Sequence, residues 1–314
     1  MAANSSLPEL PPCPGAFNQK ESDFKKGLKM RSIESLLIIF VMVCVISSLS
    51  CSKTDRASIP DLQTNHAKQN KETEVLLNSV KQGGDLRKEA RSQLIAMGQK
   101  ATPELIKNLE SSDFIIRWEI VNIFGMTKEP HAVEALVDRV LKDDNSHVRW
   151  RALWALTQID DPAIPDRLQK ALQTQKDKER WNAAVGCSMF GVREALPFLH
   201  ENLKSSDEFT AWEAVNALSR MHDQTSVSHI RSIMKERGQR IRRECALTLG
   251  KMGYPEGQSA LIEALEDQDS GVRWRAVMGL AKAKDNRVRK ALMDMKRQEK
   301  DPEVLKHLNR ALRS

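Results

Sequence analysis

The stretch Asn145-Ser-His-Val-Arg-Trp-Arg-Ala-Leu-Trp-Ala-Leu-Thr-Gln-Ile159 decides the fold, because variants of it recur along most of the chain. Its Arg-Trp dipeptide at 149–150 returns at 117–118, 180–181 and 273–274, while Ala211-Trp212 and Arg242-Arg243 occupy the same slot. From Arg117 to Leu305 the slots follow at steps of 32, 31, 31, 31, 31 and 32 residues. A constant period of this length is typical of repeat architectures, in which each unit packs only against its neighbours.

The apolar residues of this stretch follow the period of an α-helix. When successive residues are turned by about 100°, one arc carries Val148, Ala152, Ala155, Leu156 and Ile159. In every copy of the stretch we number residues from the position equivalent to Val148, which is offset 0. The small residues at offsets +4 and +7 predict that neighbouring helices approach closely. A second apolar helix, such as 131–141 or 256–265, follows each copy after a turn. Two alternating helices per repeat predict an all-α stack with a continuous shared core.

Three further elements resemble a known family. They read Val148-Arg149, Thr248-Leu-Gly-Lys-Met-Gly253 and Leu261-Ile-Glu-Ala-Leu-Glu-Asp267, and they are similar to the short HEAT repeats named after phycobilisome lyases. The resemblance covers residues 73–314. It implies a right-handed α-solenoid of about seven helix pairs, in which the helix with Val-Arg lines the concave face.

The first 51 residues differ in character and predict export. Residues 1–29 are an aperiodic extension, which a true start at Met30 would remove. In the segment 30–51, the apolar run 36–46 is shorter than the ~20 residues of a membrane span but fits a signal sequence. The following Ser47-Ser-Leu-Ser-Cys51 resembles the lipobox of bacterial lipoproteins, although these usually carry Leu where Ser48 stands.

The lipobox resemblance implies that Cys51 is lipidated; an uncleaved signal anchor or ordinary cleavage after Ser50 are the alternatives. Residues 52–72 are polar and aperiodic, and predict a flexible tether. We therefore expect a protein of the cell envelope, attached to the membrane, with residues 73–314 outside the cytoplasm on the periplasmic or surface side.

A row of arginines occupies offset +1. In the family, such residues form an acid–base ladder between adjacent repeats, and the expected acids stand three to five residues earlier, at Asp113, Asp144, Asp177 and Asp269. The arginines assigned to this structural ladder are Arg117, Arg149, Arg180, Arg242 and Arg273.

Tryptophans occupy offset +2, and one more stands at offset +6. On a helical wheel both offsets lie away from the core, so we expect a solvated apolar strip of the kind that marks interaction sites. The alternative is that curvature folds the rings against one another or onto the next repeat. Offset +3 mixes acidic and basic residues, which suits a protein or peptide partner. The candidate ligand-binding residues are Trp118, Trp150, Trp154, Trp181, Trp212 and Trp274, with Arg151 and Arg275 as orienting groups.

Other functions have weaker support in the sequence. A net charge of +7 on 314 residues is a mild bias, and glutamates on the same strip disfavour nucleic acid. Deoxyhypusine hydroxylases bind iron through several His-Glu dipeptides, whereas this chain has only His200-Glu201; phycobilin lyases share the repeat alone. Cys187 and Cys245 fall at core offsets. We therefore expect a scaffold without catalytic residues, metal or cofactor, and keep an enzyme of the HEAT-like type and a nucleic-acid-binding protein as alternatives.

Overall fold

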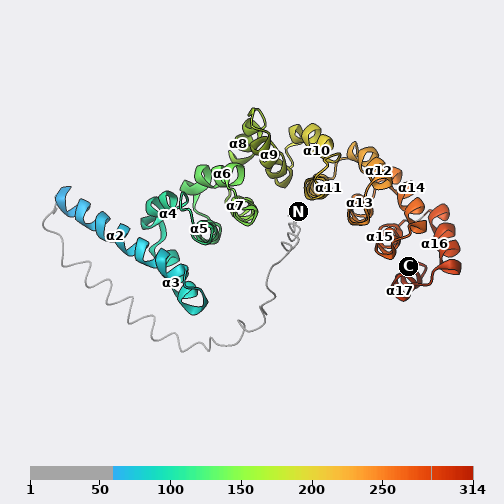
Figure 1. Cartoon of the computed structure of the whole chain (residues 1–314), viewed down its shortest axis with the longest axis horizontal. Coiled ribbons are helices and arrows are strands. Elements are labelled where there is room, and N and C mark those ends of the chain that lie inside the picture. The colour runs from blue at the N-terminus through green and yellow to red at the C-terminus, as the bar shows by residue number, and fades with distance from the viewer. Residues whose placement is uncertain (1–58, 284, 314) are drawn as a thin grey trace, which may run out of the picture. The chain divides into compact units, whose positions relative to one another are not determined.

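The computed structural model of the chain describes residues 59–283 and 285–313 (Figure 1). Its contacts divide it into two units, Met1–Lys71 and Glu72–Ser314. The extension 1–29, the segment 30–51 with Cys51, and residues 52–58 of the expected tether lie outside the described residues. Within the described ranges the regular secondary structure is entirely helical, and no helix is both long and apolar enough to cross a bilayer.

Residues 59–72 are helical, which corrects the prediction of a flexible tether. They form the first part of α2 (Ile59–Val80). No glycine interrupts this segment, and its only proline, Pro60, stands in the first turn, where the missing N–H does no harm. Most of the remaining residues are good helix formers, and Leu77 and Val80 near the other end are buried in the core.

The helices that follow α3 (Gly84–Met97) alternate between an inner and an outer row of the unit Glu72–Ser314 (Figure 1). They form seven consecutive pairs in the described part of the chain, as an all-α solenoid requires. The outer row contains α4 (Thr102–Asn108), α6 (Val133–Lys142), α8 (Ile164–Ala171), α10 (Leu196–Asn202), α12 (Ser226–Glu236), α14 (Pro255–Glu263) and α16 (Asn286–Gln298). The inner row contains α5 (Phe114–Thr127), α7 (Ser146–Gln158), α9 (Asp177–Met189), α11 (Glu208–Met221), α13 (Gln239–Met252), α15 (Ser270–Leu280) and α17 (Pro302–Ala311).

The predicted arc of small and apolar residues is the buried face of the inner helices. In α7, Val148, Ala152 and Leu156 have no exposed surface. Several inner helices begin at a side-chain cap; for example, Asp113 accepts a hydrogen bond from the backbone N–H of Ile115 at 2.9 Å. Because a cap satisfies N–H groups that the helix leaves unpaired, these polar residues set the point at which each inner helix starts.

Small residues bring inner helices α13 and α15 into backbone contact. A Cβ atom added to Gly250 would lie 2.6 Å from the Cα of Gly279, and one added to Gly279 would lie 2.8 Å from the Cα of Gly250. Gly279 stands at offset +7, where the sequence predicts close approach. The spacing of these two repeats therefore depends on the absence of both side chains.

The inner row is irregular at α9. This helix packs mainly against α6, α8 and α11. Its Asn182, at offset +3, is buried and donates a hydrogen bond from Nδ2 to the carbonyl oxygen of Leu141 in α6 at 2.8 Å. The asparagine is thereby directed towards the outer row instead of the neighbouring inner helix.

Candidate functional site

All six candidate tryptophans lie on the inner row, but they are half-buried and pack against the core. The prediction of a solvated face is therefore wrong in degree. The helical wheel describes one helix alone, whereas in the structure residues of other repeats cover part of these rings. What remains accessible is a row of partly exposed indoles, supplied by α5 (Trp118), α7 (Trp150 and Trp154), α9 (Trp181), α11 (Trp212) and α15 (Trp274).

Residues at offset +3 of the following repeat hold several of these rings. The indole Nε1 of Trp181 donates to Glu213 at 2.9 Å, and that of Trp212 donates to Glu244 at 3.2 Å. Trp274 meets the ring of His307 edge to face, with centroids 5.4 Å apart. The offset +3 residues that the sequence suggests as mixed surface charge thus serve first as locks between repeats.

Arg151 occupies the same offset and lies over the rings of Trp118 and Trp154. Its guanidinium carbon lies 3.7 Å from the ring centroid of Trp154 and 5.6 Å from that of Trp118. Its Nη2 also donates to the side-chain oxygen of Asn122 in α5. Trp154 in turn fills the space over Gly125, where a Cβ would clash with the indole. Arg151 therefore contacts the ligand-binding candidates directly, as expected of an orienting group, and it also joins α7 to α5.

The offset +3 residue of α9, Asn182, does not contact the tryptophan of the preceding inner helix, and a residue of α11 does so instead. Since Asn182 is bound to α6, the ring of Trp150 is met by Arg220 of α11, whose guanidinium carbon lies 5.4 Å from the ring centroid. Arg220 donates from Nε and Nη2 to the hydroxyl of Ser188 at 3.3 and 3.2 Å. Burial lowers the pKa of Arg220 to about 10 and raises the pKa of nearby Glu213. Two desolvated groups of opposite charge therefore lie at the centre of the inner row.

The ring of Trp274 is contacted by the guanidinium group of the next residue, Arg275. The guanidinium carbon of Arg275 lies 5.1 Å from the ring centroid of Trp274, and its Nη1 donates to the carbonyl oxygen of Gly271 at 3.1 Å. Burial lowers the pKa of Arg275. The sequence prediction that Arg275 lies beside the aromatic strip agrees with this geometry.

Three of the five arginines at offset +1 bind carboxylates of the next repeat, and of the acids expected only Asp144 is among them, as a partner of Arg117. Arg117 makes two 2.8 Å hydrogen bonds to Asp143; Arg242 binds Asp267 at 2.7 and 2.9 Å, and Arg273 binds Glu299 at 2.7 and 2.9 Å. These carboxylates stand 25 or 26 residues later, after the intervening outer helix. The hydrogen bond to Asp143 raises the pKa of Arg117.

The remaining ladder predictions need correction. Asp113 and Asp269 cap the helices that follow them, and Asp144 binds Arg117 of the preceding repeat at 2.5 Å. Arg180 pairs with Asp177 in its own helix. Arg149 donates to the backbone carbonyls of Asp143 and Asp144 at 3.0 and 3.2 Å, with no side-chain carboxylate in the contact.

The histidines and cysteines considered for chemistry lie apart from the aromatic row. His200 of α10 stacks on His229 of α12 with ring centroids 4.0 Å apart, and its Nε2 lies 2.8 Å from the hydroxyl of Ser226. Cys187 and Cys245 are buried, and burial raises the pKa of both thiols, that of Cys187 to about 12. Among residues 59–283 and 285–313, no group of three His, Cys, Asp or Glu side chains is placed to hold a metal ion.

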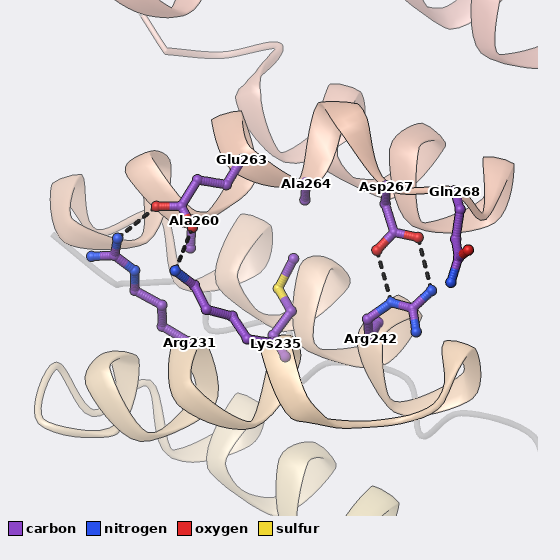
Figure 2. A pocket seen from close by; sticks show the side chains of 9 residues that line it. Arg231, Lys235, Arg242, Ala260, Glu263, Ala264, Asp267 and Gln268 are labelled. Atoms are coloured by element: carbon purple, nitrogen blue, oxygen red, sulfur yellow. Dashed lines mark hydrogen bonds and ion pairs between the residues drawn. The ribbon is translucent and has the colours of Figure 1, made fainter.

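A cavity of about 430 Å³ between α12 and the segment 255–268 was not predicted (Figure 2). Met234, Ala260 and Ala264 supply its apolar lining. Ion pairs stand at its two ends: Glu263 with Arg231 and Lys235 at 2.6 and 2.8 Å, and Arg242 with Asp267. The alanine pair four residues apart, at the end of α14 and in the 3-10 turn that follows it, is the sequence signal that could have indicated the cavity.

Sequence reasoning also missed Arg220, Ser188 and Phe209. Phe209 is exposed and lies beside Trp212, with ring centroids 5.8 Å apart. Arg220 stands at offset +10, in the last turn of α11, where a cation is ordinarily explained by the helix dipole. Arg220 contacts Trp150 only because Asn182 of α9 is directed towards α6, and no pattern within α11 reveals that contact.

Several solved structures are similar to this chain. Escherichia coli YibA is 17% identical with a TM-score of 0.51, covering 83% of this chain and 99% of its own. Human deoxyhypusine hydroxylase is 17% identical with a TM-score of 0.35, covering 79% and 97% respectively. The CpcE–CpcF phycocyanin lyase of Nostoc sp. is 18% identical with a TM-score of 0.39, covering 67% and 93%. At these identities the similarity concerns the fold alone.

None of the curated proteins compared with the chain matches it. A family model does match, with three overlapping segments at residues 102–185, 164–247 and 231–313. Together the segments span all seven helix pairs, from α4 to α17. The chain belongs to the HEAT repeat family.

Proposed function

We propose that the protein is a non-catalytic scaffold of the bacterial cell envelope that binds another protein or a peptide along the inner row of helices. The observation that carries this proposal is the row of half-exposed indoles from Trp118 to Trp274, several of them lying under a guanidinium group. A HEAT solenoid supports such a role, because stacked repeats create an extended surface for a long ligand.

Binding would combine apolar burial on the ring faces with orientation by the arginines. A partly exposed tryptophan supplies a large rigid surface at a small entropic cost, and tryptophan and arginine are the residues that most often dominate interfaces. The indole N–H groups of Trp181 and Trp212 are already used within the protein. The partner is therefore expected to contact ring faces and edges, with polar contacts made through the guanidinium groups.

The envelope assignment rests on the sequence of residues 30–51 alone. A radiolabelled palmitate experiment addresses it: the label should enter the wild-type chain and be absent from a Cys51→Ala variant. Label that persists in the variant would exclude lipidation at this residue and leave an uncleaved anchor or ordinary cleavage.

The binding surface is tested by affinity capture from envelope extracts. Because Trp154 fills the space over Gly125, its removal would disturb α5 and α7. Trp118→Leu and Trp212→Leu retain apolar bulk and are better probes. Both variants should lose captured partners. The thermal unfolding of Trp118→Leu should stay close to that of the wild type, whereas Trp212→Leu also removes the hydrogen bond to Glu244 and should unfold at a somewhat lower temperature. The matched control is Met293→Leu, which changes an exposed residue of the outer helix α16. An unchanged set of partners in both tryptophan variants would show that the rings serve packing only.

A further inference from the structure

Three arginines of the inner row differ from those of the ladder. Arg220, Arg240 and Arg275 each lie over an indole, at 5.4, 5.6 and 5.1 Å from the ring centroid of Trp150, Trp212 and Trp274 respectively. Within the described ranges none of the three forms an ion pair with a carboxylate, whereas the ladder arginines Arg117, Arg242 and Arg273 each bind one through two hydrogen bonds. The helices α11, α13 and α15 thus present three positive charges without a direct acidic partner.

Arg220 is the most desolvated of the three. Its only hydrogen-bond acceptor in the described structure is the hydroxyl of Ser188, which receives both Nε and Nη2. The nearest opposite charge, Glu213, accepts the indole N–H of Trp181 and acts on Arg220 only through space. A guanidinium group removed from water is costly unless its donors are satisfied by an anion, and the planar fork fits a carboxylate best. This environment is incomplete without one.

Arg275 repeats the situation two inner helices later. Its Nε is buried and has no hydrogen-bond acceptor. The acids around it are already engaged, since Asp269 binds Arg243 at 2.7 and 2.6 Å and Glu244 accepts the indole of Trp212. Among the residues that the structure describes, the one hydrogen-bond acceptor of Arg275 is the carbonyl oxygen of Gly271. A buried donor without an acceptor in the protein is satisfied by a water molecule or by a ligand, and the partly exposed rings on the same face make a ligand carboxylate a suitable acceptor.

We propose that the inner row from α11 to α15 binds an acidic peptide in extended conformation, with one carboxylate on Arg220 and another on Arg275. This inference rests on the proposed function and specifies the chemistry of its ligand. Apolar side chains between the two acids would lie on Trp212 and on exposed Phe209, while Arg240 adds positive charge beside them. The tryptophan face thereby becomes selective for peptides that carry negative charge.

The expected spacing of the two acids follows from helix geometry. Two steps between neighbouring helices, at roughly 8–10 Å each, separate α11 from α15. Arg220 stands at offset +10 and Arg275 at offset +3, so they differ by seven residues along the helix axis, or roughly 10 Å at ~1.5 Å per residue. The Cα atoms of the two arginines are therefore about 20 Å apart, and the guanidinium group of Arg220 lies farther still from Arg275 because its side chain extends back to Ser188 of α9. An extended chain advances ~3.3 Å per residue, which places the carboxylates at least about six residues apart.

The test uses the full-length chain in detergent and three fluorescein-labelled peptides of about twelve residues, built from Leu and Ser. One carries two Glu residues about six positions apart, the second has Gln in their place, and the third has Lys. Fluorescence anisotropy should give at least about tenfold tighter binding for the Glu peptide than for the Gln peptide, because two charge-assisted contacts are lost in the latter. Binding of the Glu peptide should weaken strongly in molar salt.

Variants of the arginines locate the binding. Arg220→Gln and Arg275→Gln should each weaken the Glu peptide by about tenfold and leave the Gln peptide unchanged. The control Arg297→Gln removes the same charge from an exposed residue of α16 and should have little effect. Arg220→Lys keeps the charge if the glutamine variant fails to fold, and Arg275→Gln, on a separate helix, tests the same idea independently.

Equal binding of the Glu and Gln peptides, or preference for the Lys peptide, would overturn the acidic specificity. If Trp212→Leu still weakened binding of both the neutral and the acidic peptides, the scaffold proposal would stand and only the acidic specificity would be lost. An equal loss in Arg297→Gln would show a general charge effect and would also overturn the inference. Failure of all three peptides to bind would overturn it as well, and would extend to the scaffold proposal only if affinity capture also found no dependence on the tryptophans.

Discussion

Alanine at Gly250 or Gly279 is expected to destabilise the repeat array, although alanine is normally the better helix residue. A Cβ at Gly250 would lie 2.6 Å from the Cα of Gly279, and one at Gly279 would lie 2.9 Å from a methyl carbon of Leu261. Carbon atoms in contact normally lie about 3.5–4.0 Å apart, so α13 and α15 would have to separate by roughly 1 Å. Overpacking of this kind costs about 1–3 kcal/mol, whereas alanine gains about 0.5–1 kcal/mol in helix propensity. The net loss therefore lies between about 0 and 2.5 kcal/mol, and a clash with a backbone Cα atom, which cannot rotate away, places it towards the upper end.

Gly257→Ala is the matched control for this prediction. Gly257 lies in α14, and a Cβ there would meet only Leu249 at the ordinary distance of 3.5 Å. This substitution should be neutral or stabilising by up to ~1 kcal/mol. Urea unfolding followed by circular dichroism gives the overall change, and hydrogen exchange shows whether protection falls first in α13 and α15, since a repeat array opens locally. If Gly250→Ala matched or exceeded the wild type in stability, the close approach of these helices would be refuted.

Three further outcomes are expected. Arg117→Met should lower the free energy of unfolding by about 1.5–3 kcal/mol because it removes both short hydrogen bonds to the buried carboxylate of Asp143, which keeps only Arg139 at 3.8 Å and the backbone N–H of Asn145 at 3.0 Å. Arg287→Met, at an exposed pair, should leave urea unfolding unchanged. Cys187, whose pKa is raised to about 12, should escape iodoacetamide near neutral pH and react only after unfolding, as peptide mass mapping would show; labelling of the native protein would contradict its burial. Burial lowers the pKa of His200 from its usual 6.5, so its contribution to stability is complete above about pH 6.5 and is lost as the pH falls through the folded-state pKa; thermal unfolding of His200→Gln should therefore depend less on pH between about 7 and 5 than that of the wild type, and equal slopes would argue against it.

Most of the fold could be predicted from the sequence because its determinants are local. The constant period fixes the number of helix pairs, and the arc containing Val148 identifies the face that becomes buried. The small residue at offset +7 indicates a close helix contact, which the structure shows between Gly279 and Gly250. The polar stretch 59–72 was misread, because a helix without an apolar face lacks the periodic signal on which the prediction relies.

The site was only partly predictable, because its contacts join different repeats. Offset +2 correctly placed the tryptophans on the inner row, but their exposure depends on what the following helix carries, as Glu213 beside Trp181 illustrates. Spacing within one helix cannot reveal that Arg242 binds Asp267, since an outer helix lies between them in sequence. Nor does any local pattern show that Asn182 faces α6, which is the cause of the contact between Trp150 and Arg220.

The contacts at offset +3 also give the solenoid a direction. Trp181, Trp212 and Trp274 are each held by the repeat that follows, never by the one before. Deleting the last pair, α16 and α17, would remove His307 from the ring of Trp274 and leave that apolar surface exposed to solvent. Deleting pairs from the N-terminal side would instead leave these three indoles covered. The two ends of the array are therefore not equivalent, and loss of the C-terminal pair should expose more indole surface at Trp274 than loss of the first pair does at that residue.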